Sequence, residues 1–266
     1  SPMRAPGEAS GSAALECAMD EMAEATGLDP LEFRLRNYAE TEPGTGKPYS
    51  SKALRECYAE GARRFGWSRR PLAPRQMQDA DGMLVGWGMG TALFPCPMFA
   101  ADARATLRAD GTALFETSAA DMGQGAWTAL AQIAADSLGL PIEKIEFRSG
   151  NSTLPDGGIA GGSGHTATAG SALDASGRDV IRQLGSMAAA DPASPLHGAD
   201  NATFQARDGR IEVEGDPARG EDLAAILHRA GLEQLEGQGS AFRKPEDAEN
   251  RAMNAHGAVF AEVKID

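Results

Sequence analysis

The sequence predicts an α+β protein in which a helical N-terminal part is followed by a mixed sheet with covering helices. Apolar residues recur with the 3.6-residue period of amphipathic helices up to about residue 65, whereas segments of period two alternate with helical ones beyond residue 82. A chain of 266 residues is long enough for one large or two ordinary domains. Because a polar stretch with two prolines separates the two patterns, we expect a helical domain over residues 1–75 and an α+β domain over residues 82–266.

Three helices are expected in the first part. Residues 8–26 place small or apolar side chains on one face with acids between them, and Gly27 ends the pattern. A second helix is predicted to begin at Asp29-Pro30, with Asp29 as the N-cap, and to end near Asn37. A third is expected over residues 51–65.

The second part alternates strands with helices. Strands are expected at residues 83–91, 101–107, 113–118, 144–148, 203–206, 210–213 and 258–265. Helices are expected at residues 126–138, 166–189 and 220–230. The order of strand 113–118, helix 126–138 and strand 144–148 predicts a βαβ-like or split arrangement. Residues 93–99 form an apolar, proline-bearing loop in this scheme.

Composition excludes several classes of function. The formal net charge of -13, without a basic stripe, argues against binding to nucleic acid or to an anionic membrane surface. The sequence has no run of eighteen apolar residues, so no membrane span is expected. Three widely spaced cysteines predict no disulfide framework. The first residues lack the features of a signal peptide, and cytoplasmic and periplasmic locations both stay open.

Two glycine-rich turns precede two of the predicted helices. One is Asp121-Met122-Gly123-Gln124-Gly125, and the other runs from Gly161 to Thr166. Glycine allows close approach to a ligand, and a helix start offers unpaired N–H groups and a positive dipole end. The two turns could therefore hold a phosphate or another anionic heterocycle. Because a lone Gly-x-Gly is a weak signal, two ordinary turns remain the alternative.

Other reactive residues give no clear assignment. His165 could be a ligand or a base, but the four histidines lack chelating spacing and predict no metal site. Cys96, between two prolines, is more typical of a small buried hydrophobe than of a nucleophile. No pair of carboxylates stands out, so no general base is assigned. Arg4, beside Ala5-Pro6-Gly7, is either held in a shaped turn or simply solvated.

Several motifs, in a fixed order, resemble the molybdenum-binding large subunit of the xanthine dehydrogenase and aldehyde oxidase family. The resemblance covers nearly the whole chain and rests on separate stretches, which makes it specific. They are Met3-Arg4-Ala5-Pro6-Gly7 with the helix after it, Asp29-Pro30-Leu31-Glu32-Phe33, Asp121-Met122-Gly123-Gln124-Gly125, Leu154-Pro155 leading to Gly161-Gly162-Ser163, and Glu262-Val263-Lys264-Ile265-Asp266.

This resemblance implies that residues 1–75 are the C-terminal part of one molybdopterin-binding domain and that residues 82–266 are the N-terminal part of a second. The implied cofactor is molybdopterin with molybdenum, in the cytosine dinucleotide form of the bacterial branch, and no protein side chain is expected to bind the metal. Arg4 is expected to lie beside the pocket for the substrate and molybdenum. The residues expected to bind the cofactor are Met122, Gly123, Gln124 and Gly125 on the pterin, and Gly162, Ser163, Gly164 and Thr166 on its phosphate-bearing side.

The implied activity of the intact protein is oxidation of an aldehyde or a heteroaromatic carbon with oxygen from water. Partner subunits with 2Fe-2S clusters, and in some cases FAD, are expected. The family's essential glutamate base lies downstream of Asp266, so we expect no catalytic residue within these residues and no activity from the chain alone. Pro6 occupies one place of the aromatic pair that holds purines, which favours an aldehyde. A non-catalytic binding or assembly module on the same scaffold is the alternative.

Overall fold

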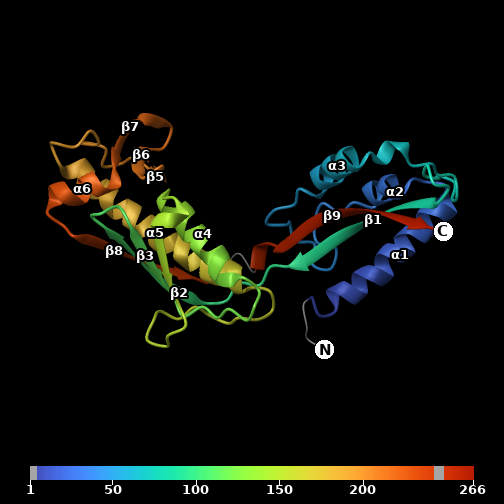
Figure 1. Ribbon diagram of the computed structural model, residues 1–266, viewed down its shortest axis with the longest axis horizontal. Helices are drawn as coiled ribbons and strands as arrows, with labels where there is room; N and C mark the ends of the chain where they lie inside the picture. Colours follow the sequence, from blue (N-terminus) through green and yellow to red (C-terminus); the bar gives the residue numbers. More distant parts are fainter. Residues whose placement is uncertain (1–4, 243–248) are drawn as a thin grey trace. The chain divides into compact units, whose positions relative to one another are not determined.

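The computed structural model describes residues 5–242 and 249–266, which fold into two compact units (Figure 1). Unit 1 comprises residues 1–96 and 244–266, and unit 2 comprises residues 97–243. Unit 1 is discontinuous because the last strand returns to pair with the first. None of the helices in the described ranges is long and apolar enough to cross a membrane. The mixture of helices and sheets confirms the α+β class, while the division into residues 1–75 and 82–266 stays a prediction.

Unit 1 contains the three predicted helices. Asp29 is the N-cap of the second, because its carboxylate accepts a hydrogen bond from the Leu31 amide at 2.9 Å and Pro30 takes the first helical position. The first helix ends at Gly27 in the left-handed conformation, as expected. The helical elements are α1 (Glu8–Thr26), α2 (Pro30–Arg36), α3 (Leu54–Phe65) and the short 3-10 helix η1 (Trp67–Arg69).

A long antiparallel ribbon runs through unit 1. Strand β1 (Leu84–Pro95) pairs along its whole length with β9 (Asn254–Ile265). Both strands are longer than predicted: Leu93–Pro95 were assigned to a loop, and β9 begins four residues before Ala258. Cross-strand hydrogen bonding to the partner extends each strand beyond its own alternating pattern.

Helix α3 and η1 cover this ribbon with an aromatic core. Tyr58 and Trp67 are buried there, and the Trp67 ring meets the ring of Phe260 from β9 edge to face at 5.3 Å. Phe65 meets Trp87 from β1 in the same way at 4.9 Å. A small core thus forms around one face of a two-stranded sheet, which alone would be only marginally stable.

A buried arginine connects α1, α2 and β1. Arg34 of α2 is only 3% exposed, and its Nη2 and Nε lie 2.7 and 2.9 Å from Oε2 of Glu16. The same Oε2 accepts a hydrogen bond from the Thr91 amide at 2.9 Å. Asp20 lies 2.7 Å from Nη1 as an ion pair without an aligned hydrogen bond. Only Arg34 is fully buried, since the side chain of Glu16 is 18% exposed and that of Asp20 is 43% exposed. The arginine therefore depends on these carboxylates for the interactions that replace its lost hydration.

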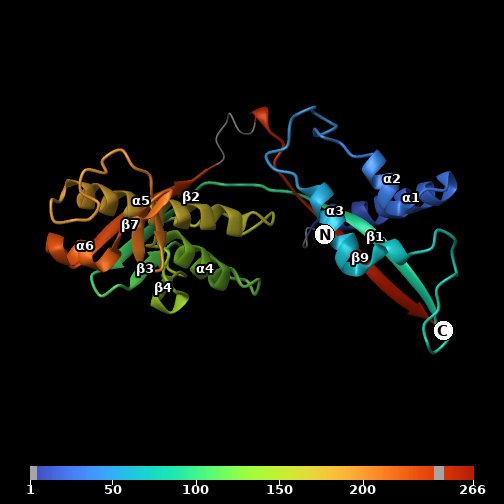
Figure 2. The same ribbon diagram turned by 90° about the horizontal axis from the view of Figure 1, so that it is seen from above.

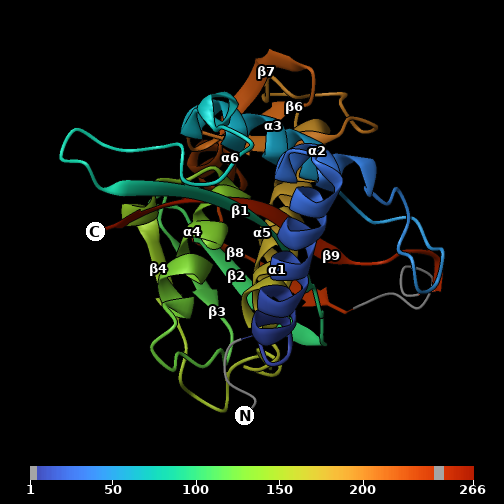
Figure 3. The same cartoon turned by 90° about the vertical axis from the view of Figure 1, so that its right-hand side faces the viewer.

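Unit 2 is built on a four-stranded sheet in the order β4-β3-β2-β8 (Figure 3). Strands β3 and β4 are parallel and are connected through α4, which confirms the predicted βαβ-like unit. The other neighbours are antiparallel. The elements are β2 (Ala101–Arg108), β3 (Ala113–Glu116), α4 (Ala126–Leu138), the 3-10 helix η2 (Ile142–Lys144), β4 (Ile145–Arg148), α5 (His165–Ala190) and β8 (Gln234–Ala241).

Strand β8 was not predicted from the sequence, and it contains Gly237 and Gly239. The glycines are needed for close contact with α5. A Cβ on Gly239 would lie 2.2 Å from the carbonyl oxygen of Ala172, and one on Gly237 would lie 2.5 Å from that of Ser176. Glycine in a strand commonly marks such an approach of another backbone.

A smaller sheet and α6 complete unit 2. The predicted hairpin is confirmed as β5 (Phe204–Arg207) and β6 (Arg210–Val213). The predicted helical start at Gly220 is wrong, because Asp216–Asp222 form β7, which pairs with β6. Helix α6 (Leu223–Ala230) begins only after Asp222, whose carboxylate accepts a hydrogen bond from the Ala224 amide at 2.9 Å.

Replacing Arg34 with Met should destabilise unit 1 by about 1–3 kcal/mol, because Glu16, whose side chain is only 18% exposed, would lose its partner. The matched control is Arg36→Met on the same helix, whose ion pair with Glu32 is exposed and contributes about 0–1 kcal/mol. Urea unfolding followed by tryptophan fluorescence measures both, since Trp67 and Trp87 lie in unit 1. Equal losses in the two variants would contradict the role of the buried cluster.

Candidate functional site

Helices α4 and α5 lie side by side and run in the same direction (Figure 2). A Cβ on Gly170 of α5 would lie 2.7 Å from the side chain of Ile133, and one on Gly177 would lie 2.0 Å from Oγ of Ser137. The contacts therefore advance along both helices together. Both helix starts, and both predicted glycine turns, lie at the same end of unit 2.

The segments that lead into the two turns are hydrogen-bonded to each other. The Gly157 amide donates to Oγ of Ser118 at 3.0 Å, and the Ser118 amide donates to the carbonyl oxygen of Pro155 at 2.7 Å. Nε1 of Trp127 donates to the carbonyl oxygen of Ala119 at 3.0 Å. The turns thus belong to one connected loop cluster.

The start of α4 is occupied by the chain's own carboxylate. Asp121 accepts hydrogen bonds from the amides of Gly123 at 2.8 Å and Trp127 at 3.2 Å. These amides, with Gly123 the strongest, hold the pKa of Asp121 below its usual value. Gln124 also folds back, because its Oε1 accepts from the Met122 amide at 2.6 Å. This turn is not a free anion site.

The start of α5 is different. No side chain among the described residues caps it, and Gly164 stands at the N-cap position. Ser163 takes a left-handed backbone with φ of 57°, and both Ser163 and Thr166 are exposed. A long helix with uncapped N–H groups favours a negative charge at this end. An anion at this cluster would therefore bind at α5 in preference to α4.

Residues 97–99 support the glycine turn before α5. A Cβ on Gly164 would lie 2.6 Å from the carbonyl oxygen of Pro97, so only glycine fits there. The Phe99 amide donates to Oγ1 of Thr168 at 3.0 Å, which fixes the segment against the first turns of α5. The sequence placed Pro97–Phe99 in a loop but gave no sign of this role.

The cluster fits a flat heterocycle that carries a phosphate. Gly123 and Gly125 have positive φ, and a Cβ on either would meet no heavy atom within 4 Å, so ligand atoms can approach this backbone. Met122 and Ile159 in these loops and Trp127 in the first turn of α4 are exposed apolar side chains, with Met122 72% exposed. Within the described residues, no three His, Cys, Asp or Glu side chains are placed to hold a metal ion.

The remaining candidate residues from the sequence are His165, Cys96 and Arg4. His165 is 6% exposed, and neither of its ring nitrogens has a hydrogen-bond partner in the described part of the chain. Cys96 is half-buried at the end of β1 with a free thiol. Arg4, expected by the substrate, lies outside the described residues.

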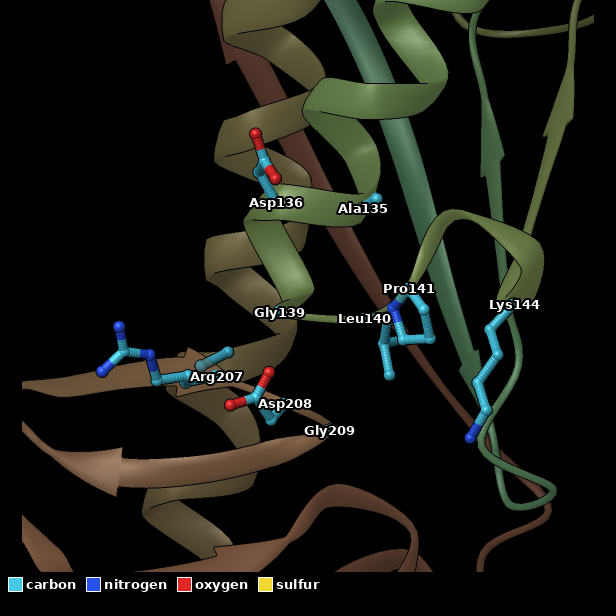
Figure 4. Close-up of a pocket in the computed structure, with 10 residues that line it drawn as sticks. Ala135, Asp136, Gly139, Leu140, Pro141, Lys144, Arg207, Asp208 and Gly209 are labelled. Carbon is cyan, nitrogen blue, oxygen red and sulfur yellow. The ribbon is translucent and has the colours of Figure 1, made fainter.

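A hollow of about 610 Å³ lies at the opposite end of α4, where Gly139 ends the helix (Figure 4). Its charged side chains do not converge, since Lys144 lies across the hollow from Arg207 and Asp208 in this view. The C-terminal end of a helix disfavours an anion. This hollow is therefore a poor candidate for a phosphate-bearing ligand.

Sequence comparison identifies a family. The pattern of the molybdopterin cofactor-binding domain matches residues 60–266, and a second pattern of the same description matches residues 1–38. The aldehyde oxidoreductase molybdenum-binding subunit PaoC of Escherichia coli K12 is 38% identical over 191 residues, which are 71% of this chain and 26% of that protein. The putative xanthine dehydrogenase molybdenum-binding subunit XdhA of the same strain is 35% identical over 150 residues, or 53% of this chain and 19% of that protein.

Solved structures agree on the fold. A Cu,Mo-CO dehydrogenase superposes with a TM-score of 0.69 at 21% identity, covering 97% of this chain and 35% of that one. The aldehyde oxidoreductase of Desulfovibrio desulfuricans gives 0.62 at 22% identity, covering 98% and 27%. The chain spans about a quarter of the length of the PaoC proteins that it matches in two strains of Escherichia coli.

Replacing Asp121 with Asn should destabilise the protein at neutral pH, because the carboxylate bonds the amides at the start of α4. Its folded pKa lies below the unfolded value of about 3.9, so this stabilisation is present above pH ~4 and is lost as the pH falls through the folded pKa. Thermal unfolding across pH 2–7 measures the difference between variant and wild type.

The control for this prediction is Asp136→Asn, which removes an exposed carboxylate near the other end of α4. There a negative charge opposes the helix dipole, so this variant should lose no stability at pH 7. A loss that persists unchanged at low pH in Asp121→Asn would contradict the capping role.

Proposed function

The chain belongs to the molybdopterin cofactor-binding domain family, and we propose that it forms part of the molybdopterin site of a molybdenum hydroxylase. The observation that carries the proposal is the uncapped start of α5 beside the open glycine backbone of the α4 turn. The first suits a phosphate and the second suits a ring system.

The residue roles follow from this difference between the turns. We assign the phosphate-bearing side of the cofactor to Gly162, Ser163, Gly164 and Thr166, at the positive end of α5. The pterin is assigned to the α4 turn, where Met122 offers an exposed apolar surface and Asp121 would repel a phosphate. Residues of that turn in contact with the pterin are Met122, Gly123, Gln124 and Gly125.

When bound, the molybdenum cofactor supplies the two-electron oxidation chemistry of the reaction. The chain's own contribution is to bind and orient it. The network that links Ser118, Gly157 and Trp127 fixes the turns relative to each other. Placing the ring system against one helix start and the phosphate against the other would set the cofactor's orientation.

We infer an aldehyde as the substrate of the full-length protein, with Arg4 beside it. Two observations support this: the similarity to PaoC, an aldehyde oxidoreductase subunit, and the place of Pro6 where purine enzymes have an aromatic ring. The cytosine dinucleotide form of the cofactor and partner subunits with 2Fe-2S clusters and FAD belong to the same proposal.

Replacing Thr166 with Asp in the full-length protein should lower its cofactor content at least tenfold while leaving its thermal stability unchanged or raised. A carboxylate in the first turn of α5 would cap that turn, as Asp121 does at α4, and would repel the phosphate. Molybdenum is measured by mass spectrometry, and the nucleotide released by acid hydrolysis identifies the dinucleotide.

The matched control is Thr166→Asn, which has the same shape without the charge and should keep most of the cofactor. Full cofactor content in Thr166→Asp would contradict the assignment of the phosphate to α5. Release of no CMP from a molybdenum-loaded wild type would exclude the cytosine dinucleotide form.

The isolated chain of residues 1–266 is expected to retain no cofactor and to be inactive, whereas the full-length protein should reduce an artificial electron acceptor when given an aldehyde. The reason is that the chain spans only about a quarter of the length of its PaoC relatives. Near-stoichiometric molybdenum with aldehyde-dependent dye reduction by the isolated chain would overturn this expectation. A molybdenum-free, inactive full-length protein would instead support a non-catalytic binding or assembly module.

A further inference from the structure

His165 is the first residue of α5, and its imidazole is unpaired although it is buried. Neither Nδ1 nor Nε2 has a hydrogen-bond partner among the described residues. A neutral imidazole carries one donor and one acceptor, and burying them unpaired is unfavourable. In the same unit, Nδ1 of His197 lies 3.1 Å from the carbonyl oxygen of Ala189, so the fold pairs one histidine and not the other.

His165 directly follows the glycine turn of residues 161–164 in the chain. The Cα–Cβ bond of a helical residue tilts toward the N-terminus of its helix. The side chain of the first residue of α5 therefore starts toward residues 161–164 and the uncapped amides. These residues include three glycines and Ser163 in the left-handed region, so a small change of the turn can expose the ring.

We propose that the turn of residues 161–164 shifts when the cofactor binds and that a ring N–H of His165 then donates to a phosphate oxygen at the start of α5. This inference rests on the proposed function. A phosphate is favoured over the pterin because an N–H donor bonds a charged oxygen more strongly than a neutral one. The Asp121 carboxylate also keeps a phosphate away from the neighbouring α4 start.

The test compares His165→Phe with His165→Gln in the full-length protein. Phe fills the buried space without polar atoms, so the cofactor-free protein should keep or gain thermal stability, while the cofactor dissociates about 10- to 100-fold faster. Gln retains an N–H donor and should dissociate more slowly than Phe. Dissociation is followed during dialysis as the molybdenum and acid-released nucleotide that remain on the protein.

A purely structural role predicts another pattern, in which His165→Phe lowers the stability of the cofactor-free protein and Gln does not rescue cofactor retention. That pattern, or an unchanged dissociation rate in His165→Phe, would overturn the proposal while the proposed function stands. A wild-type protein that carries no molybdopterin would overturn both.

A measurement on the wild type does not depend on how the variants fold. In protein labelled with ¹⁵N-histidine, the ring resonances of His165, assigned from their loss in His165→Gln, should shift between the cofactor-free and loaded states. The ring resonances of His197, already paired to a backbone carbonyl, should stay in place. Unchanged His165 resonances would exclude a bond to the cofactor.

Discussion

Close parallel packing of α4 on α5 is the constraint on which the candidate site depends. It requires Gly170 and Gly177 on α5, since a Cβ at Gly177 would overlap Oγ of Ser137. Helix α5 also packs on the sheet, and Gly237 and Gly239 on β8 allow the backbone of α5 to approach that strand closely. Because two backbones that approach this closely have little room to slide, the direction and register of α5 are fixed. Two loops far apart in sequence thereby become neighbours.

That geometry alone would make two equivalent anion sites, and the side chains remove the equivalence. Asp121 satisfies the amides at the α4 start and places a negative charge there, whereas α5 keeps its uncapped amides. The end of unit 2 is therefore electrostatically asymmetric. A ligand with an apolar ring and a charged tail can bind it in only one favourable orientation. The asymmetry arises from one residue, and it gives the site more selectivity than two bare helix starts would have.

The sequence predicted those features that depend on local chemistry. The helix period, the Asp29 cap, the βαβ unit and the two glycine turns were each visible in neighbouring residues. The extent of β1, the start of α6 and the existence of β7 and β8 were not, because they depend on pairing partners. The need for glycine at position 239 could not be read from neighbouring residues, because it lies across the fold, in the close approach to Ala172. The family resemblance named the turns, but neither it nor the residue pattern indicated that Asp121 would fill one of them or that His165 would be buried unpaired.

In unit 1, the turn that begins at Ala5 must also be held in a defined position. Within the described residues, the Ala9 amide donates to the carbonyl oxygen of Ala5 at 3.1 Å, so this turn is joined to the first turn of α1. Helix α1 is in turn held to α2 and β1 through Glu16, which bonds both Arg34 and the Thr91 amide. A buried ion pair contributes little net stability compared with apolar packing, but it accepts few geometries. We infer that the cluster around Arg34 serves to fix α1, and with it the turn that begins at Ala5, because Ala23 is the only buried residue of this helix and apolar packing could not do so.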